Sequence, residues 1–377
     1  MNNRKTLLIV INVDWLFKLH RLSIAVAAQK EGFKVIVAAK DTGESKWIEK
    51  SGIQFINLAI SRSGTNPLIE AKLLVAMYTL YKTINPTIVY QITMKPVIYG
   101  SLISRLLNIK TVNAISGLGY NFTQNRRGFV QKIMSQLMRI GFNKRNNHLI
   151  FENRDDYNEL YKLKIVSEKT AVNFSNGVGV DLNYFIPNIK QDSQPLEIIL
   201  ASRMLWDKGI KEFVEAAKLL KVNYFGKVLF KLVGSIDEEN KEAVSKMYLK
   251  NNEIPNYIEW IGYQDNMFSI YKNTAIAVLP SYREGRPVVL LEACAMGIPI
   301  VTTNAIGCRD CVDEGINGFK VPVKSVDDLA NAIEKLIINK SLRTVMGVNS
   351  RKKAENEFSQ VEVINMHLRI FNSLLNI

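Results

Sequence analysis

Residues 275–297 are the stretch that decides the fold, and they read Ala-Ile-Ala-Val-Leu-Pro-Ser-Tyr-Arg-Glu-Gly-Arg-Pro-Val-Val-Leu-Leu-Glu-Ala-Cys-Ala-Met-Gly. The first five residues are all apolar, which is typical of a strand that is buried on both faces. Pro287 suits the first position of a helix, and Gly297 is typical of the residue that follows the end of one. The stretch therefore predicts a strand at 275–279, a loop, and a helix from about 287 to 296.

The same alternation of strand and helix recurs along the rest of the chain, which predicts βαβ units and parallel sheets. In the first half we predict strands at 6–11, 34–38, 53–58, 87–91, 110–115 and 147–151, with helices near 20–31, 67–84, 95–107, 128–142 and 153–162. In the second half we predict strands at 197–201, 228–233, 257–261, 275–279 and 298–302, with helices at 208–220, 264–272, 287–296, 325–338, 341–356 and 360–376.

The chain has 377 residues, which suits two domains better than one compact core. Residues 187–196 are polar and contain two prolines, so they are expected to form a linker. We therefore expect an α/β protein with two doubly wound Rossmann-like domains, 1–186 and 197–358, facing each other across a cleft. A last helix within 359–377 is expected to pack back on the first domain. Ligands of such sheets bind beyond the carboxyl ends of the strands.

The composition excludes several classes of protein. Three cysteines are too few for a disulfide framework, which favours the reducing cytoplasm, and Cys308 and Cys311 lack the further ligands that a zinc site needs. No run of 18 apolar residues exists, and the apolar start fits a buried strand better than a signal peptide. The formal net charge is +14, and no acidic residue lies between Glu70 and Glu152. The basic excess therefore belongs to the first half.

Two glutamates lie on either side of the start of the predicted helix. Glu284 lies in the loop, and Glu292 lies five residues beyond Pro287, about 7.5 Å along the helix axis. The free amides of the first turn form an anion site between them. This arrangement suits a ligand with two hydroxyl-bearing rings joined by a diphosphate, because carboxylates accept hydrogen bonds from hydroxyl groups. The alternative is two solvated residues, although Glu292 has such apolar neighbours that we expect it to be partly buried and to have a partner.

A second group of candidates follows the strand at 197–201. Arg203 and Lys208 can converge on a phosphate group at a strand-to-helix turn, and Gly209 allows close approach of the backbone. Gly234 ends another predicted strand and is expected to line the same site. The alternative for Arg203 and Lys208 is a pair of surface bases.

Taken in order, these motifs resemble the donor domain of family-4 retaining glycosyltransferases, which have the GT-B fold. The resemblance rests on Arg203 with Lys208-Gly209, the segment from Leu279 to Ala293, the segment Gly297-Ile298-Pro299-Ile300-Val301, and Asn317-Gly318-Phe319. It covers residues 196–340 strongly and the first half more weakly. The stretch 307–310, Gly-Cys-Arg-Asp, resembles a subgroup that builds bacterial surface polysaccharides.

The resemblance implies a role for each matching residue. Arg203 and Lys208 would bind the donor diphosphate, and Glu292 would bind the ribose hydroxyl groups. Glu284 would bind the transferred sugar together with the backbone of Gly285, Arg286, Pro287 and Val288. The resemblance implies no bound metal and no cofactor, with the UDP-sugar as co-substrate. Arg286 departs from the family, which often has an apolar residue there.

The first half supplies candidates for binding the acceptor. Asp14, His20 and Arg21 follow the first strand, and their setting resembles the N-terminus of enzymes that extend lipid-linked oligosaccharides. The loop with Gly119 and Tyr120 is similar to one in enzymes that act on undecaprenyl-diphosphate sugars. The alternative for His20 is a residue that caps a helix. Some family members have a histidine in this region and this chain does not, so the residue that would activate the acceptor is not identified. The phosphate of the donor can take the acceptor proton, so no protein base is required.

A basic amphipathic segment lies within the acid-free window. We expect it to lie in the headgroup plane of an anionic membrane. Its candidate docking residues are Arg126, Arg127, Lys132, Arg139, Lys144 and Arg145. The alternative is a crossover helix with a solvated basic face. A nucleic-acid partner is disfavoured, because no binding module and no interleaved aromatic residues are present.

The sequence therefore predicts a retaining, metal-independent hexosyltransferase located in the cytoplasm, on the inner face of the cytoplasmic membrane. It would move a sugar, of the N-acetylhexosamine type, from a UDP-sugar to a lipid-diphosphate-linked saccharide during bacterial polysaccharide or glycan assembly. Two alternatives are a non-catalytic scaffold that binds nucleotide sugars and a UDP-sugar isomerase of the same fold.

Overall fold

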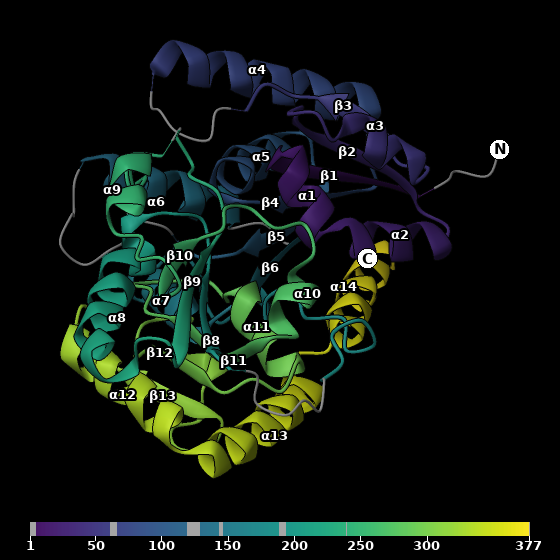
Figure 1. Cartoon of the computed structure of the whole chain (residues 1–377). Helices are drawn as coiled ribbons and strands as arrows, with labels where there is room; N and C mark the ends of the chain where they lie inside the picture. The colour runs from purple at the N-terminus through teal and green to yellow at the C-terminus, as the bar shows by residue number, and fades with distance from the viewer. Residues whose placement is uncertain are drawn as a thin grey trace. The chain divides into compact units, whose positions relative to one another are not determined.

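The computed structural model describes residues 5–60, 66–118, 129–142, 146–187, 194–238 and 240–376 (Figure 1). The chain forms two compact units. The first contains residues 1–178 and 362–377, and the second contains residues 179–361. The boundary lies before the predicted linker, and each unit has its own parallel sheet.

The sheet of the first unit has the order β3-β2-β1-β4-β5-β6-β7, and its neighbouring strands are parallel. Its strands are β1 (Thr6–Val13), β2 (Lys34–Lys40), β3 (Gln54–Asn57), β4 (Ile88–Ile92), β5 (Lys110–Ile115), β6 (Asn147–Phe151) and β7 (Ala171–Phe174). The helices are α1 (Asp14–His20), α2 (Leu22–Lys30), α3 (Ser45–Lys50), α4 (Pro67–Ile84), α5 (Met94–Leu106), α6 (Phe129–Phe142), α7 (Arg154–Lys162) and α14 (Gln360–Leu375).

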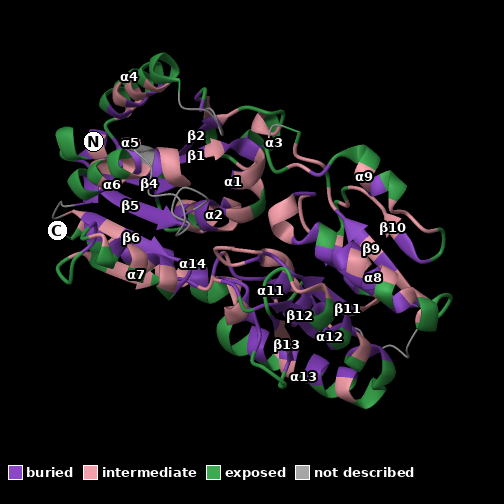
Figure 2. Cartoon of the chain, turned by 90° about the vertical axis from the view of Figure 1, so that its left-hand side faces the viewer, coloured by how far each residue is buried: buried purple, intermediate pink, exposed green. Residues whose placement is uncertain are grey.

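The core of this unit lies on both faces of its sheet. Residues 7–11 of β1 are fully buried, and they alternate between two apolar clusters on opposite faces. Burial on both faces explains why β1 is almost continuously apolar. The C-terminal helix α14 belongs to this unit from Glu362 onward, and Phe371 packs in the same cluster as β1. Figure 2 shows the strands as buried and the outer faces of helices such as α4 as exposed.

The sheet of the second unit has the order β10-β9-β8-β11-β12-β13 and is also parallel. Its strands are β8 (Leu196–Ala201), β9 (Val228–Val233), β10 (Ile258–Trp260), β11 (Thr274–Leu279), β12 (Ile300–Thr303) and β13 (Gly318–Val321). The helices are α8 (Ile210–Tyr224), α9 (Lys246–Asn251), α10 (Met267–Tyr271), α11 (Val288–Ala295), α12 (Val326–Ile338) and α13 (Lys340–Glu357), with short 3-10 turns η2 (Trp206–Lys208) and η3 (Arg309–Cys311).

A glycine brings the ends of β8 and β11 close together. Gly209 follows η2 with a φ of +75°, a conformation that side chains disfavour. A Cβ atom at this position would lie 2.3 Å from the carbonyl oxygen of Pro280, which follows β11. Only glycine therefore allows the turn after β8 to pack against the loop after β11.

The structure agrees with the predicted α/β architecture and corrects several elements. The predicted helix at 20–31 corresponds to α2 alone, and the separate helix α1, which ends at His20, was not predicted. The predicted strands omit β7 and β13, and the predicted helices omit α3 and α9. These elements have six residues or fewer, so they carry too little periodic pattern to be recognised. Among the described residues, no helix is both long and apolar enough to cross a membrane.

Candidate active site

The strand order of the second sheet reverses between β8 and β11, where ligands of open parallel sheets bind. Lys208 follows β8 and Glu284 follows β11. The Nζ atom of Lys208 lies 2.7 Å from Oε1 of Glu284, and the hydroxyl group of Ser281 donates to the same oxygen over 2.6 Å. The fold therefore joins a cation and a carboxylate that are 76 positions apart in the sequence.

Lys208 stays charged in this setting. Burial alone would lower the pKa of its ammonium group, but the negative charges of Glu284 and Asp207 and the hydrogen bond to Glu284 together outweigh burial and raise the pKa. The two side chains are 12% and 16% exposed, so their attraction is weakly screened by solvent while some surface stays accessible. The pair can therefore present a positive and a negative group to one ligand.

Backbone contacts hold the loop that carries Glu284. The amide of Tyr282 donates to the carbonyl of Asp207 over 2.8 Å, and the amide of Glu284 donates to the carbonyl of Ile306 over 3.0 Å. A Cβ atom on Gly307, whose φ is +80°, would lie 2.5 Å from the carbonyl oxygens of both Glu284 and Gly285. The loops after β8, β11 and β12 thus form one rigid frame.

Arg203 also lies at this edge of the sheet. It forms an ion pair with Asp237, which follows β9, and its side chain is 40% exposed. Gly234 directly follows β9, and its carbonyl accepts a hydrogen bond from Nε1 of Trp260 over 2.9 Å. Asp237 was not predicted from the sequence, and it determines where the guanidinium group of Arg203 lies.

The helix α11 begins one residue later than predicted, because Pro287 is its N-cap residue. In the part of the chain that is described, the amides of Val288 and Val289 have no acceptor, while those of Leu290 and Leu291 approach the carbonyl of Pro287. The first turn therefore presents free amide groups at the carboxyl edge of the sheet, as the anion-site prediction requires.

Glu292 has the partner that its apolar neighbours led us to expect. The hydroxyl group of Tyr271 donates to Oε2 of Glu292 over 3.1 Å, and it also lies 3.0 Å from the carbonyl oxygen of Val289. Burial raises the pKa of Glu292 to about 7, and the hydrogen bond from Tyr271 opposes only part of that rise. This carboxyl group therefore changes its protonation state near neutral pH.

The raised pKa of Glu292 makes stability depend on pH. The folded protein binds a proton at Glu292 up to about pH 7, whereas the unfolded chain releases it near the ordinary value of 4.5. The free energy of unfolding therefore falls as the pH rises from 4.5 to 7. Because Gln is always neutral, we expect Glu292→Gln to be more stable than wild type by about 3 kcal/mol at pH 8 and equal to it at pH 4.5. Thermal unfolding at both pH values checks this, and an equal difference at both would contradict it.

Arg286 contacts the turn after β12. It forms an ion pair with Asp310 over 3.6 Å, its side chain is 8% exposed, and its charge opposes the rise that burial causes in the pKa of Cys311. In this position Arg286 helps to hold together the loops around Glu284. Its predicted contact with the donor stays a prediction.

The three cysteines are buried, and the described residues contain no group of three side chains that could hold a metal ion.

In the first unit, Asp14 is fully buried and has its own partners. Its carboxylate accepts hydrogen bonds from the amides of Trp15, Thr42 and Glu44 and from the hydroxyl group of Thr42. Burial alone would raise its pKa, but these hydrogen bonds outweigh burial and lower it. They give Asp14 a structural role in holding the turn after β2, and its acceptor contact stays a prediction.

His20 and Arg21 lie at the junction of α1 and α2. Arg21 is 4% exposed, and its Nη2 atom lies 3.3 Å from Oε1 of Glu152 and 3.3 Å from the hydroxyl oxygen of Ser116. Burial lowers the pKa of His20 to about 4, and the nearby charge of Arg21 adds to this effect. His20 is therefore neutral at physiological pH.

Several predicted residues lie outside the described residues. These are the acceptor candidates Gly119 and Tyr120 and the docking candidates Arg126, Arg127, Lys144 and Arg145. Of the docking residues that the structure describes, Lys132 is exposed on α6. Arg139 is also exposed, and it donates to the carbonyl oxygens of Leu163 and Lys164 just after the end of α7.

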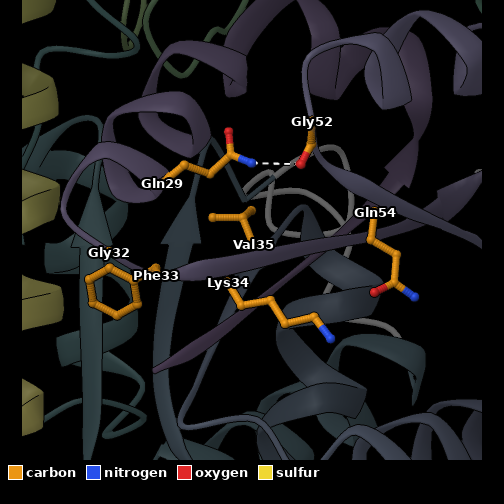
Figure 3. A pocket seen from close by; sticks show the side chains of 7 residues that line it. All are labelled: Gln29, Gly32, Phe33, Lys34, Val35, Gly52 and Gln54. Carbon is orange, nitrogen blue, oxygen red and sulfur yellow. Dashed lines mark hydrogen bonds between the residues drawn. The ribbon is translucent and has the colours of Figure 1, made fainter. Parts of the chain in front are cut away.

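A hollow of about 410 Å³ lies on the first unit (Figure 3). It is lined by Gln29, Gly32, Phe33, Lys34, Val35, Gly52 and Gln54. Residues 34 and 35 begin β2 and residue 54 begins β3, so the hollow lies at the amino ends of these strands. The amide group of Gln29 is bonded to the carbonyl of Gly52, as Figure 3 shows. Because ligands of such sheets bind at the carboxyl ends, the hollow is not the candidate site.

Sequence reasoning missed four residues of these clusters: Ser281, Tyr271, Asp237 and Glu152. Ser281 is adjacent to the predicted motif, and a search for hydroxyl groups near Glu284 could have found it. The other three are distant in sequence from their partners, and no motif connects them.

Comparison with known proteins agrees with this geometry. Residues 6–153 match the family "Glycosyl transferase 4-like", and residues 185–353 match "Glycosyl transferases group 1". The chain is 26% identical, over 94% of its length and 95% of the relative, to N,N'-diacetylbacillosaminyl-diphospho-undecaprenol alpha-1,3-N-acetylgalactosaminyltransferase of Campylobacter jejuni.

A second relative and a solved structure extend the comparison. The chain is 25% identical, over 89% of its length and 88% of the relative, to UDP-Gal:alpha-D-GlcNAc-diphosphoundecaprenol alpha-1,3-galactosyltransferase of Escherichia coli. The crystal structure of a glycosyltransferase from Rickettsia africae has the same fold, with a TM-score of 0.75, 21% identity and 99% coverage of both chains. The two matched family domains, in this order and on two parallel sheets, show that the chain belongs to the glycosyltransferases of the GT-B fold.

Proposed function

We propose that this glycosyltransferase moves a sugar from a UDP-sugar to a saccharide linked to a lipid diphosphate, with retention of configuration and without a bound metal. The observation that carries the proposal is the contact of Lys208 and Ser281 with Glu284 at the switch point of the second sheet. The two relatives described above support the acceptor class, because both are named for undecaprenyl-diphosphate-linked saccharides.

The donor is held by the second unit. Lys208 and Arg203 neutralise the diphosphate, and the free amides at the start of α11 add partial positive charge. Glu292 accepts hydrogen bonds from the ribose, and Glu284 accepts one from the transferred sugar. The transferred sugar is of the N-acetylhexosamine type, which agrees with the name of the Campylobacter relative.

The reaction exchanges one bond at the anomeric carbon of the sugar. The bond from this carbon to the diphosphate oxygen breaks, and a bond to the acceptor oxygen forms on the same face. The acceptor hydroxyl group gives its proton to the departing phosphate oxygen, so no protein base is needed. Charge that develops on the diphosphate is stabilised by Lys208 and Arg203, which the fold positions in advance. The alpha-1,3 linkage named for both relatives supports retention, because the usual UDP-hexose donors are α-linked.

A donor screen tests this function directly. The purified full chain is mixed with each of several UDP-sugars and a synthetic polyprenyl-diphospho-N-acetylglucosamine, with a metal chelator present. We expect UDP release and a product one sugar larger for one donor. Binding of UDP-sugar without release of UDP would favour a scaffold, and a changed sugar without acceptor would favour an isomerase.

We further propose that the protein acts at the inner face of the cytoplasmic membrane and that α6 contacts that surface. The exposed side of α6 carries Lys132 with Ile133 and Ile140, which are 44% and 43% exposed. Two exposed apolar side chains one heptad apart, beside a cation, fit the interface of an anionic bilayer.

Binding to vesicles tests this contact. We expect the full chain to float with phosphatidylglycerol vesicles and to be released as the salt concentration rises. Lys132→Glu should weaken binding at least about fivefold, because a basic residue near an anionic surface contributes about 1 kcal/mol. Lys246→Glu, on the exposed surface of α9, serves as the matched control. Vesicle binding that is unchanged by added salt and by Lys132→Glu would contradict the proposal.

A further inference from the structure

A buried ion pair lies at the carboxyl edge of the first sheet. Glu152 follows β6, Ser116 follows β5, and Arg21 lies beyond the end of β1. Arg21 and Glu152 are in contact over 3.3 Å, and their side chains are 4% and 8% exposed. A charge pair is costly to bury, so its place at the ligand-binding edge of the sheet calls for an explanation.

The charges around this pair cancel. Arg21 is balanced by Glu152, and His20 is neutral because burial and the charge of Arg21 lower its pKa to about 4. His367 is also neutral, because burial and Arg21 lower its pKa to about 3. Burial raises the pKa of Tyr90 to about 12, so its hydroxyl group keeps its proton. A diphosphate needs an excess of positive charge, which this cluster does not have.

Two polar atoms beside the Arg21–Glu152 ion pair are buried without a hydrogen-bond partner among the described residues. They are Nδ1 of His20 and Nε of Arg21. Buried polar atoms are nearly always hydrogen-bonded, so such atoms at a ligand-binding edge indicate contact with a ligand. The Nε–H group of Arg21 donates, and the carboxylate of Glu152 accepts. A set of donors and acceptors with no net charge suits hydroxyl groups, each of which can donate and accept.

We propose that Glu152 is an acceptor-binding residue, which accepts a hydrogen bond from a hydroxyl group of the acceptor saccharide. Arg21 orients the carboxylate of Glu152 through its Nη2 atom, and its Nε–H group, which has no partner among the described residues, donates to the same saccharide. The neutral sugar of the acceptor, and not its diphosphate, then lies at this edge of the first sheet. This inference rests on the proposed function, because it takes the acceptor to be a lipid-diphosphate-linked saccharide.

The experiment compares two lipids that differ by one sugar. Dissociation constants of farnesyl diphosphate and farnesyl-diphospho-N-acetylglucosamine are measured for the full chain in the presence of UDP. We expect the sugar to tighten binding to wild type. The variant Glu152→Gln should reduce that gain about tenfold, because hydrogen bonds to charged groups are the stronger ones. Binding of farnesyl diphosphate itself should change less than twofold.

Controls separate this inference from a loss of fold and from a failure of the proposed function. Glu49→Gln makes the same chemical change at an exposed position of α3 and should keep the full gain from the sugar. Thermal unfolding shows whether Glu152→Gln is folded. An absent gain in wild type, or an equal loss for both lipids in Glu152→Gln, overturns the inference. UDP affinity reports on the second unit, so failure to bind UDP would instead count against the proposed function.

Discussion

Glu284→Gln reduces the turnover number of sugar transfer by about 10³-fold while the protein stays folded. Gln can still accept the hydrogen bonds that Ser281 and Lys208 donate to Oε1, so the loop keeps its local contacts. The variant removes only the negative charge that, in the proposed function, faces the transferred sugar, whose anomeric carbon becomes positive in the transition state. Loss of one preorganised electrostatic contact of this kind costs about 10²–10³ in turnover number. Steady-state kinetics with the donor found in the screen measures the effect.

A matched substitution controls for a general loss of charge. Glu355→Gln changes an exposed residue that forms an ion pair with Arg351 on α13, and exposed pairs contribute little. We expect wild-type turnover for this variant. If Glu284→Gln also kept wild-type turnover, the assignment of Glu284 to the donor site would be wrong.

Lys208→Ala reduces turnover by about 10²–10³-fold and weakens UDP binding as well. Its ammonium group is the cation that lies beside Glu284, and the departing diphosphate needs that positive charge. The variant also leaves Glu284 partly buried without its cation, so we expect the melting temperature to fall. Turnover, UDP affinity and thermal unfolding are measured on the same preparation.

The double variant Lys208→Ala, Glu284→Gln separates a direct role of Lys208 in the reaction from a defect caused by an unpaired charge on Glu284. Because the two side chains touch, their effects on turnover should be far from additive, and stability should partly recover. Lys211→Ala, at an exposed position on α8 three residues away, is the control and should match wild type. Additive losses in turnover would mean that Lys208 and Glu284 act independently.

The architecture could be predicted well because strands buried on both faces leave a clear pattern. Residues 7–11 of β1 and the apolar run of β11 are recognisable without knowledge of their neighbours. The missed strand β7 lies at the edge of its sheet, with its two end residues exposed and its two middle residues half-buried. An edge strand of four residues is stabilised by pairing with β6, and no property of its own sequence reveals that pairing.

The candidate donor residues were predicted from motifs, whereas their pairing was not. The spacing of Glu284 and Glu292 on a loop and a helix is a local property, and so is the turn that carries Lys208. The contact of Lys208 with Glu284 depends on the adjacency of β8 and β11, two strands that are far apart in the chain. Asp237 and Glu152 show the same dependence, because each contacts an arginine that follows a different strand of its sheet.

By itself, the sequence determined that this chain is an α/β protein and predicted a donor site around Glu284, because hydrophobic periodicity and turn chemistry act over a few residues. The tertiary structure alone decided which charges meet. It joined Lys208 to Glu284, Arg203 to Asp237 and Arg21 to Glu152. The physical reason is that a parallel sheet places the carboxyl ends of its strands side by side in an order that differs from their order in the chain.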